Sequence, residues 1–142
     1  MLVTIDNINA LAWQKMDSLI PAIIQHHKTG AVLMQGYMNI ESLQQTLVSG
    51  KATFYSRSKK ALWVKGETSG NFLHIKQVLA DCDQDCLLIA CDPIGPSCHL
   101  GTESCFPEQQ LSQQNFLSQL EKVIESRKKD DPENSYTAPL FS

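Results

Sequence analysis

The chain has 142 residues, of which 42% are hydrophobic and 19% are charged, a balance typical of one globular domain and not of a disordered chain. Its formal net charge of −3 argues against a protein that coats nucleic acid, but it is compatible with a local basic pocket for one phosphate group. The sequence contains neither an apolar run long enough to cross a membrane nor a secretory signal, so we expect a cytoplasmic protein without nucleic-acid or membrane partners.

The first elements differ in how clearly the sequence specifies them. Residues 11–25 mix helix and strand signals, and both interpretations stay open. A turn at residues 26–30 precedes an apolar run at 31–34, which predicts a strand. Asn39 favours a helix start and Gly50 a helix end, and Leu43 and Leu47 lie one turn apart between them, so we expect a helix there.

Short strands dominate the middle of the chain. Residues 53–56 are rich in β-formers, and a polar, basic connection separates them from a second strand at 62–65. A loop with a glycine at each end follows at 66–71, and residues 72–80 and 86–91 predict two further strands. Prolines and glycines make helix unfavourable from Pro93 to about Phe106. We therefore expect an α+β fold, a compact β-rich domain with short strands and one or two flanking helices.

The character of the sequence changes near residue 111. Apolar residues then recur at helical spacing with polar residues opposite them, and Arg127 to Lys129 suit a helix C-terminus. Residues 130–134 resemble a linker in composition. We assign residues 1–110 to one domain and residues 111–142 to a C-terminal helix and linker.

Five cysteines lie between Cys82 and Cys105 and none lies elsewhere, a pattern that fits metal binding or a reactive thiol better than a disulfide framework. Cys82, Cys98 and Cys105 are candidate zinc ligands; three protein ligands leave a fourth position for water, whose pKa the metal lowers towards neutrality. His99 is either a fourth ligand that closes the site or a general base that stays off the metal. The alternative is that the cysteines are ordinary buried residues.

An acidic run adjoins the first of these cysteines. Asp81, Asp83 and Asp85 alternate along a segment that we expect to be extended, where alternate side chains point the same way and converge on one hard cation such as Mg²⁺. Cys82 would then face the opposite side. The alternatives are a solvated acidic turn or a calcium loop, and Cys86 argues against the calcium loop because it occupies the position of that loop's glycine.

Two polar stretches supply the groups that a phosphate monoester needs, namely hydroxyls, backbone N–H groups at glycines, and basic side chains. Either stretch is also compatible with an ordinary polar turn, and Trp63 suits stacking on a base or filling the core. Beside a metal cluster, these stretches predict a zinc hydrolase acting on a phosphorylated nucleotide. The candidate substrate-binding residues are Ser56, Arg57, Ser58, Trp63, Lys65, Gly66, Glu67, Thr68, Ser69, Gly70 and Asn71.

Five ordered blocks give the sequence a specific resemblance. Over about residues 11 to 107 it resembles the phosphoribosyl-AMP cyclohydrolase family, which opens the adenine ring of phosphoribosyl-AMP in histidine biosynthesis. The blocks are Leu33-Met34-Gln35-Gly36-Tyr37-Met38-Asn39, Tyr55-Ser56-Arg57-Ser58, Leu62 to Asn71, Asp81-Cys82-Asp83-Gln84-Asp85, and Gly95-Pro96-Ser97-Cys98-His99 through Ser104-Cys105-Phe106.

The resemblance implies specific chemistry. It implies an intertwined homodimer with one zinc per subunit, held by Cys98, Cys105 and Cys82 of the partner subunit, and Mg²⁺ at the three aspartates. It further implies hydrolysis of the N1–C6 bond of the purine, with hydroxide on zinc adding at C6 and His99 as general base. A different class, a nucleotide-binding module with a structural zinc, remains the alternative. A nucleobase deaminase is disfavoured because its His-x-Glu and Pro-Cys-x-x-Cys motifs are absent from the sequence.

Small departures from the family pattern accompany the resemblance. Lys59 stands where the family commonly has a second arginine, and Cys86 and Cys91 are expected to be core thiols. The segment from Leu111 to Phe141 resembles the bridge that leads, in two-domain relatives, to a phosphoribosyl-ATP pyrophosphohydrolase domain. That domain does not follow within these 142 residues, so we expect no pyrophosphohydrolase activity from this chain.

Overall fold

The computed structural model describes residues 1–111, 120, 121 and 123–125. The chain divides into two units, of which the first comprises residues 1–27 and 31–109 and contains all the named helices and strands. In the second unit, residues 120, 121 and 123–125 are helical, in agreement with the helical spacing in that region. The other residues of the segment 112–142, including the linker predicted at 130–134, lie outside the described residues.

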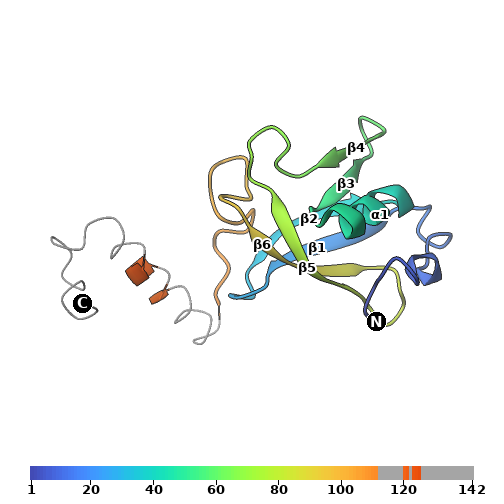
Figure 1. Ribbon diagram of the computed structural model, residues 1–142, viewed down its shortest axis with the longest axis horizontal. Helices are drawn as coiled ribbons and strands as arrows, with labels where there is room; N and C mark the ends of the chain where they lie inside the picture. Colours follow the sequence, from blue (N-terminus) through green and yellow to red (C-terminus); the bar gives the residue numbers. More distant parts are fainter. Residues whose placement is uncertain (112–119, 122, 126–142) are drawn as a thin grey trace. The chain divides into compact units, whose positions relative to one another are not determined.

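A four-stranded mixed sheet forms the base of the first unit (Figure 1). Its order is β2 (Val32–Met38), β1 (Ile20–His26), β6 (Leu87–Pro93) and β5 (Leu73–Ala80). β1 runs antiparallel to β2 and parallel to β6, and β5 and β6 form an antiparallel pair. In β1, alternate residues are buried because successive side chains of a strand point to opposite faces.

A second layer covers one face of this sheet. It contains the hairpin of β3 (Thr53–Ser56) and β4 (Ala61–Val64), helix α1 (Ile40–Ser49) and the short 3₁₀ helix η1 (Ile8–Ala10). Phe54 of β3 is fully buried between the layers, and a Cβ on Gly36 would lie only 2.6 Å from its ring. Gly36 therefore allows the two layers to pack closely.

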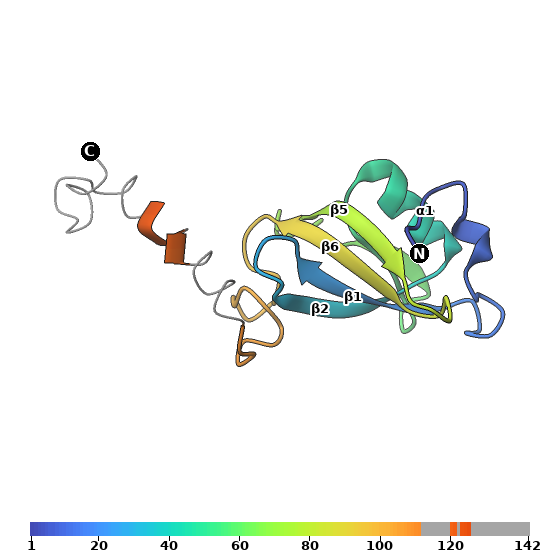
Figure 2. The ribbon, with the colours of Figure 1, turned by 90° about the horizontal axis from the view of Figure 1, so that it is seen from below.

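Within the first unit, the opposite face of the sheet carries no second layer. Figure 2 shows the four strands side by side with no helix or strand of this unit in front of them. Ile23, Leu88 and Leu79 are paired across β1, β6 and β5 and share this open face, and Leu88 is 38% exposed. A row of apolar side chains thus crosses the open face.

Helix α1 confirms the local signals at its ends. The Asn39 side chain accepts a hydrogen bond from the Ser42 N–H, and the Ser42 hydroxyl oxygen accepts one from the Asn39 N–H, which completes a capping box. Gly50 ends the helix at φ 76°, a left-handed conformation that favours glycine. The helix occupies the range predicted from the sequence.

The predicted α+β class is confirmed, since the described domain is mostly sheet with few helices. Residues 53–56 form a strand as predicted, and the predicted strands at 62–65, 72–80 and 86–91 correspond to β4, β5 and β6 with shifted ends. The ambiguous segment ends in β1, and the strand predicted at 31–34 extends to Met38 because β1 pairs along it. No helix among the described residues is long and apolar enough to span a membrane.

Candidate functional site

Two loops predicted separately from the sequence meet at one end of the sheet. The loop at residues 65–71 follows β4, and the loop at residues 94–105, here called the cysteine loop, follows β6. The Ile94 N–H donates to the Phe72 carbonyl at 2.9 Å, and Gly95 lies so close to Asn71 that a Cβ would fall 2.5 Å from the Asn71 Oδ1. Because Gly95 has φ 75° and no side chain, it permits this contact.

The cysteine loop brings two of the predicted zinc ligands together. Hydrogen bonds from Ser97 N–H to Glu103 O and from Cys98 N–H to Thr102 O, both 3.1 Å, fold the loop back on itself. The Leu100 N–H, 3.5 Å from the Cys98 sulfur, lowers the pKa of that thiol, and the Thr102 hydroxyl and Cys105 add to the effect. Cys98 is therefore the more acidic of the two thiols.

Cys105 differs from Cys98 in its environment. Burial raises the pKa of the Cys105 thiol, and its hydrogen bond and charge interaction with Cys98 act in the same direction. The positive charge of Lys65 acts in the opposite direction and lowers the pKa of both thiols. Lys65, one of the predicted substrate-binding residues, thus lies near the pair of cysteines.

Strand β2 anchors the cysteine loop at its other end. The Ser104 hydroxyl donates to the Val32 carbonyl, and the Cys105 N–H donates to Leu33 O at 2.8 Å. The Gln109 side chain accepts from the Val32 N–H at 2.8 Å and donates to its carbonyl at 2.7 Å. These hydrogen bonds to the backbone of β2 attach the segment that carries Cys105 to a regular strand. The position of Cys105 is therefore set by the sheet.

Cys82 lies at the opposite end of the sheet from the other two cysteines. It occupies the turn after β5, near the Ala80–Leu87 end of the β5–β6 hairpin, whereas the cysteine loop begins beyond the Leu73–Pro93 end. The strand between them rises about 3.3 Å per residue, about 23 Å in all. Among the described residues, no three His, Cys, Asp or Glu side chains of one chain are close enough to hold a metal ion.

The acidic segment is a turn, so the expectation that it is extended is wrong. The Asp81 carboxylate accepts hydrogen bonds from the backbone N–H groups of Asp85 at 3.0 Å and Cys86 at 3.3 Å, which closes the turn. Asp85 forms an ion pair with Lys15 at 2.9 Å, and Lys15 lowers the pKa of that carboxyl. These local hydrogen bonds replace the strand pairing that the turn residues lack. The third carboxylate, that of Asp83, is exposed.

The remaining candidates divide between surface and core. His99 is exposed beside Cys98. Arg57, in the β3–β4 turn, lies with its guanidinium carbon 4.1 Å from the centre of the Tyr37 ring, and the Ser56 and Ser58 hydroxyls are 3.3 Å apart. Trp63 packs on Phe54 with ring centroids 5.0 Å apart, which agrees with the core interpretation.

A cavity of about 260 Å³ adjoins the loop after β4, and Trp63 forms part of its wall. Its lining contains several of the predicted substrate-binding residues. They are Trp63, Lys65, Gly66, Glu67, Thr68 and Ser69, together with Val64.

Several positioning residues were not among the sequence candidates. Tyr37 and Ser104 stand inside the blocks that carried the family resemblance, so the blocks contained them without indicating a role. Gln109 lies outside the blocks, and nothing in its local sequence marks it. Buried His26 approaches Glu103 of the cysteine loop at 4.0 Å, and its position on β1 becomes informative only with the fold.

Comparison with known proteins defines first the class and then the family. Residues 34–107 match a family model described as Phosphoribosyl-AMP cyclohydrolase, a description that defines a class of hydrolases, and the matched range contains both loops. The chain belongs to the phosphoribosyl-AMP cyclohydrolase family, as the five sequence blocks predicted.

The relatives named Histidine biosynthesis bifunctional protein HisIE are longer than this chain. The protein of Escherichia coli strain K12 is 55% identical over 132 residues, which cover 93% of this chain and 64% of the relative. That of Photorhabdus laumondii is 52% identical over 141 residues, 99% of this chain and 70% of the relative. That of Photobacterium profundum is 50% identical over 140 residues, 95% and 68% respectively.

Proposed function

We propose that this chain hydrolyses the N1–C6 bond of the purine ring of phosphoribosyl-AMP, as a step of histidine biosynthesis. Water supplies the oxygen that ends on C6, and N1 leaves with a proton. The observation that carries the proposal is the pair of Cys98 and Cys105 beside Lys65, within the segment that matches the cyclohydrolase family. The names of the relatives support the pathway.

The proposed zinc ligands are Cys98, Cys105 and Cys82 of the partner subunit. The donor set fits zinc because thiolates bind it strongly, and the loop already lowers the pKa of Cys98. The Ser97 hydroxyl beside Cys98 is buried and has no hydrogen-bond partner among the described residues, which fits a site that is completed by a further group. When bound, zinc would supply the Lewis acidity that makes water nucleophilic near neutral pH.

A homodimer accounts for the distance between Cys82 and the other two cysteines. If two copies pack through the open sheet face about a twofold axis, the β5–β6 turn of each approaches the opposite end of the other. Symmetry then completes two equivalent sites at once. The apolar row of Ile23, Leu79 and Leu88 supports this face as the contact.

His99 is proposed as the general base, since it is exposed beside Cys98 and imidazole is the side chain that most often transfers protons in catalysis. Lys65, the hydroxyls of the loop after β4 and the turn at Ser56, Arg57 and Ser58 are proposed to bind the phosphate and orient the ring.

Mg²⁺ is proposed at the acidic turn through Asp81, Asp83 and Asp85. Three carboxylates within five residues suit a hard cation, but they are not close enough to share one in this structure, so binding requires the turn to rearrange and Asp85 to exchange its Lys15 partner for the ion. Selective chelation of Mg²⁺ is expected to lower activity without unfolding the protein. Full activity after verified removal would contradict this site.

The decisive experiment follows ring opening by ultraviolet absorbance, with zinc-loaded protein and phosphoribosyl-AMP. Turnover is expected for the wild-type chain. His99→Ala should lower the rate by about a hundredfold or more, because a general base contributes that much, while zinc content and dimer mass stay unchanged. No turnover by the zinc-loaded wild-type would overturn the proposal. Loss of zinc or fold in His99→Ala would favour a binding module with structural zinc.

A further inference from the structure

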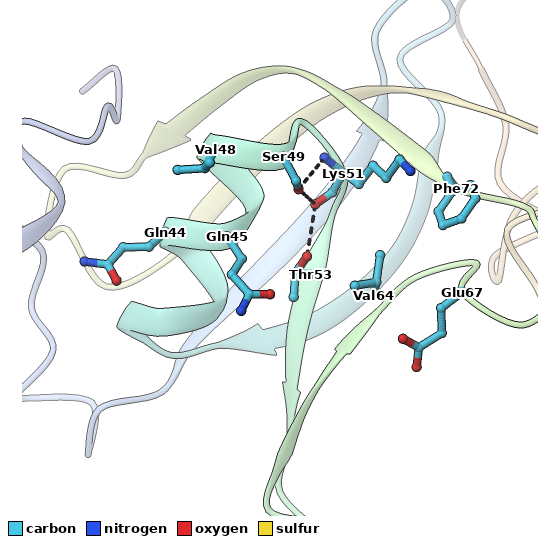
Figure 3. A pocket seen from close by; sticks show the side chains of 9 residues that line it. All are labelled: Gln44, Gln45, Val48, Ser49, Lys51, Thr53, Val64, Glu67 and Phe72. Atoms are coloured by element: carbon cyan, nitrogen blue, oxygen red, sulfur yellow. Dashed lines mark hydrogen bonds between the residues drawn. The ribbon is translucent and has the colours of Figure 1, made fainter.

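A cavity on the first unit contains neither cysteine of the pair. It has a volume of about 510 Å³, within the range of small-molecule sites, and opens between helix α1, strand β3 and the segment that flanks the loop after β4. Its lining residues are Gln44, Gln45, Val48, Ser49, Lys51, Thr53, Val64, Glu67 and Phe72 (Figure 3).

The lining combines an apolar surface with one charge of each sign. Val48, Val64 and Phe72 provide the apolar part, and the Lys51 ammonium lies 4.1 Å from the centre of the Phe72 ring. The Glu67 carboxylate belongs to the same lining, and Figure 3 shows Lys51 and Glu67 on either side of Val64. No ion pair joins Lys51 and Glu67 among the described residues. The Lys51 ammonium nitrogen is therefore more than 4.0 Å from the Glu67 carboxylate oxygens.

Separated opposite charges around an apolar floor are complementary to a zwitterion with an apolar body. We propose that this cavity binds a free amino acid with an aromatic or large apolar side chain. Its carboxylate pairs with Lys51, its ammonium group pairs with Glu67, and its side chain packs on Val48, Val64 and Phe72. Charge-assisted hydrogen bonds of this kind are stronger than neutral ones, and together they select the zwitterion.

The cavity is separate from the cysteine pair but shares a short segment with it. Val64, Glu67 and Phe72 line the cavity, whereas Lys65 acts on the thiols and Asn71 contacts Gly95. The loop between them is tightly closed, since the Gly70 N–H donates to Gly66 O at 2.7 Å. A ligand in the cavity therefore contacts the two flanks of the loop after β4.

Binding is tested by calorimetry on the full chain, which requires neither zinc nor turnover and so stays independent of the proposed activity. L-phenylalanine at millimolar concentrations is the first probe. 3-phenylpropionate lacks its ammonium group, 2-phenylethylamine lacks its carboxylate, and glycine lacks its side chain. Phenylalanine is expected to bind more tightly than any of the other three. Absence of binding, or equal affinity for all four probes, would overturn the proposal.

Two lysine variants test whether the probes bind in this cavity. Lys51→Met should weaken phenylalanine binding about tenfold and leave phenylethylamine unaffected, because only the carboxylate loses its partner. The matched control, Lys76→Met on β5, removes an exposed lysine outside the cavity and should bind normally. Equal affinities in these two variants would contradict the proposed role of Lys51.

A third variant does not depend on the charges. Val48 is 78% exposed, so Val48→Trp is expected to fold, and its indole should fill the opening and reduce binding of every aromatic probe. Unfolding of each variant is monitored by circular dichroism, and Lys51→Arg should retain binding because it retains the charge. Undiminished binding by folded Val48→Trp would place the ligand elsewhere and overturn the assignment.

Discussion

At the scale of single residues, the thiols of this protein differ because their surroundings differ. The Leu100 N–H lowers the pKa of Cys98, whereas burial raises the pKa of Cys91 to about 12. The thiolate is the reactive form of cysteine. The fraction of each thiol that is ionised at a given pH, which its pKa determines, therefore sets how fast it reacts.

Alkylation should follow this order in metal-free protein. Cys98 is expected to react with iodoacetamide first, Cys105 more slowly, and Cys91 only after unfolding. As the pH falls below 9, labelling of Cys98 should persist while that of Cys105 declines, since a lowered pKa keeps more thiolate at a given pH. Mass spectrometry of timed samples measures the order, and equal rates at Cys98 and Cys91 in folded protein would contradict it.

Gly95 has no side chain, which allows the cysteine loop to contact Asn71 of the loop after β4. Gly95→Ala is expected to cost about 1 kcal/mol from positive φ, plus a further loss as the Cβ displaces Asn71. Gly50→Ala, at a similar φ with nothing within 4 Å, is the control for conformational strain alone. Urea denaturation of both variants isolates the contact between the loops, and equal losses of stability would show that the contact contributes nothing.

At the scale of elements, one face of the sheet is left uncovered by the other elements of the first unit. Leu88→Asp places a charge in the middle of the apolar row and is expected to shift the proposed dimer to monomer, because burying an unpaired carboxylate is unfavourable. Val48→Asp, on the exposed side of α1, should leave the mass unchanged. Light scattering after size exclusion measures both, and a dimeric Leu88→Asp variant would exclude this face as the contact.

At the scale of the whole molecule, the cysteines themselves can report whether a site spans two chains. Cys82→Ser and Cys98→Ser homodimers should both be inactive. In a mixed dimer, Cys82 of one chain meets Cys98 and Cys105 of the other and restores one of two sites. Random mixing is therefore expected to recover about a quarter of wild-type activity.

A matched mixture controls for this complementation. Cys98→Ser mixed with Cys105→Ser should remain inactive, because both changes fall on the same side of the proposed site. Activity in the second mixture, or none in the first after verified subunit exchange, would contradict a zinc site shared between subunits.

Local interactions made several features predictable from the sequence. Helix α1 lies between Asn39 and Gly50 because the caps satisfy backbone groups within a few residues, and the β-formers at 53–56 are followed by a turn that closes their hairpin. The family was predictable because motif blocks are themselves sequence features. The acidic turn was mispredicted because the strand pattern does not reveal where hydrogen bonds from Asp85 and Cys86 to Asp81 end the strand.

The sequence by itself determined the caps, most of the strands, the family and the list of candidate residues, all of which depend on local chemistry or on motifs. Only the tertiary structure decided which candidates meet. It brought Cys98 and Cys105 together beside Lys65, left Cys82 at the far end of the β5–β6 hairpin, and set Lys51 and Glu67 around one cavity. The physical reason is that such proximity arises from strand pairing and layer packing between residues distant in the chain.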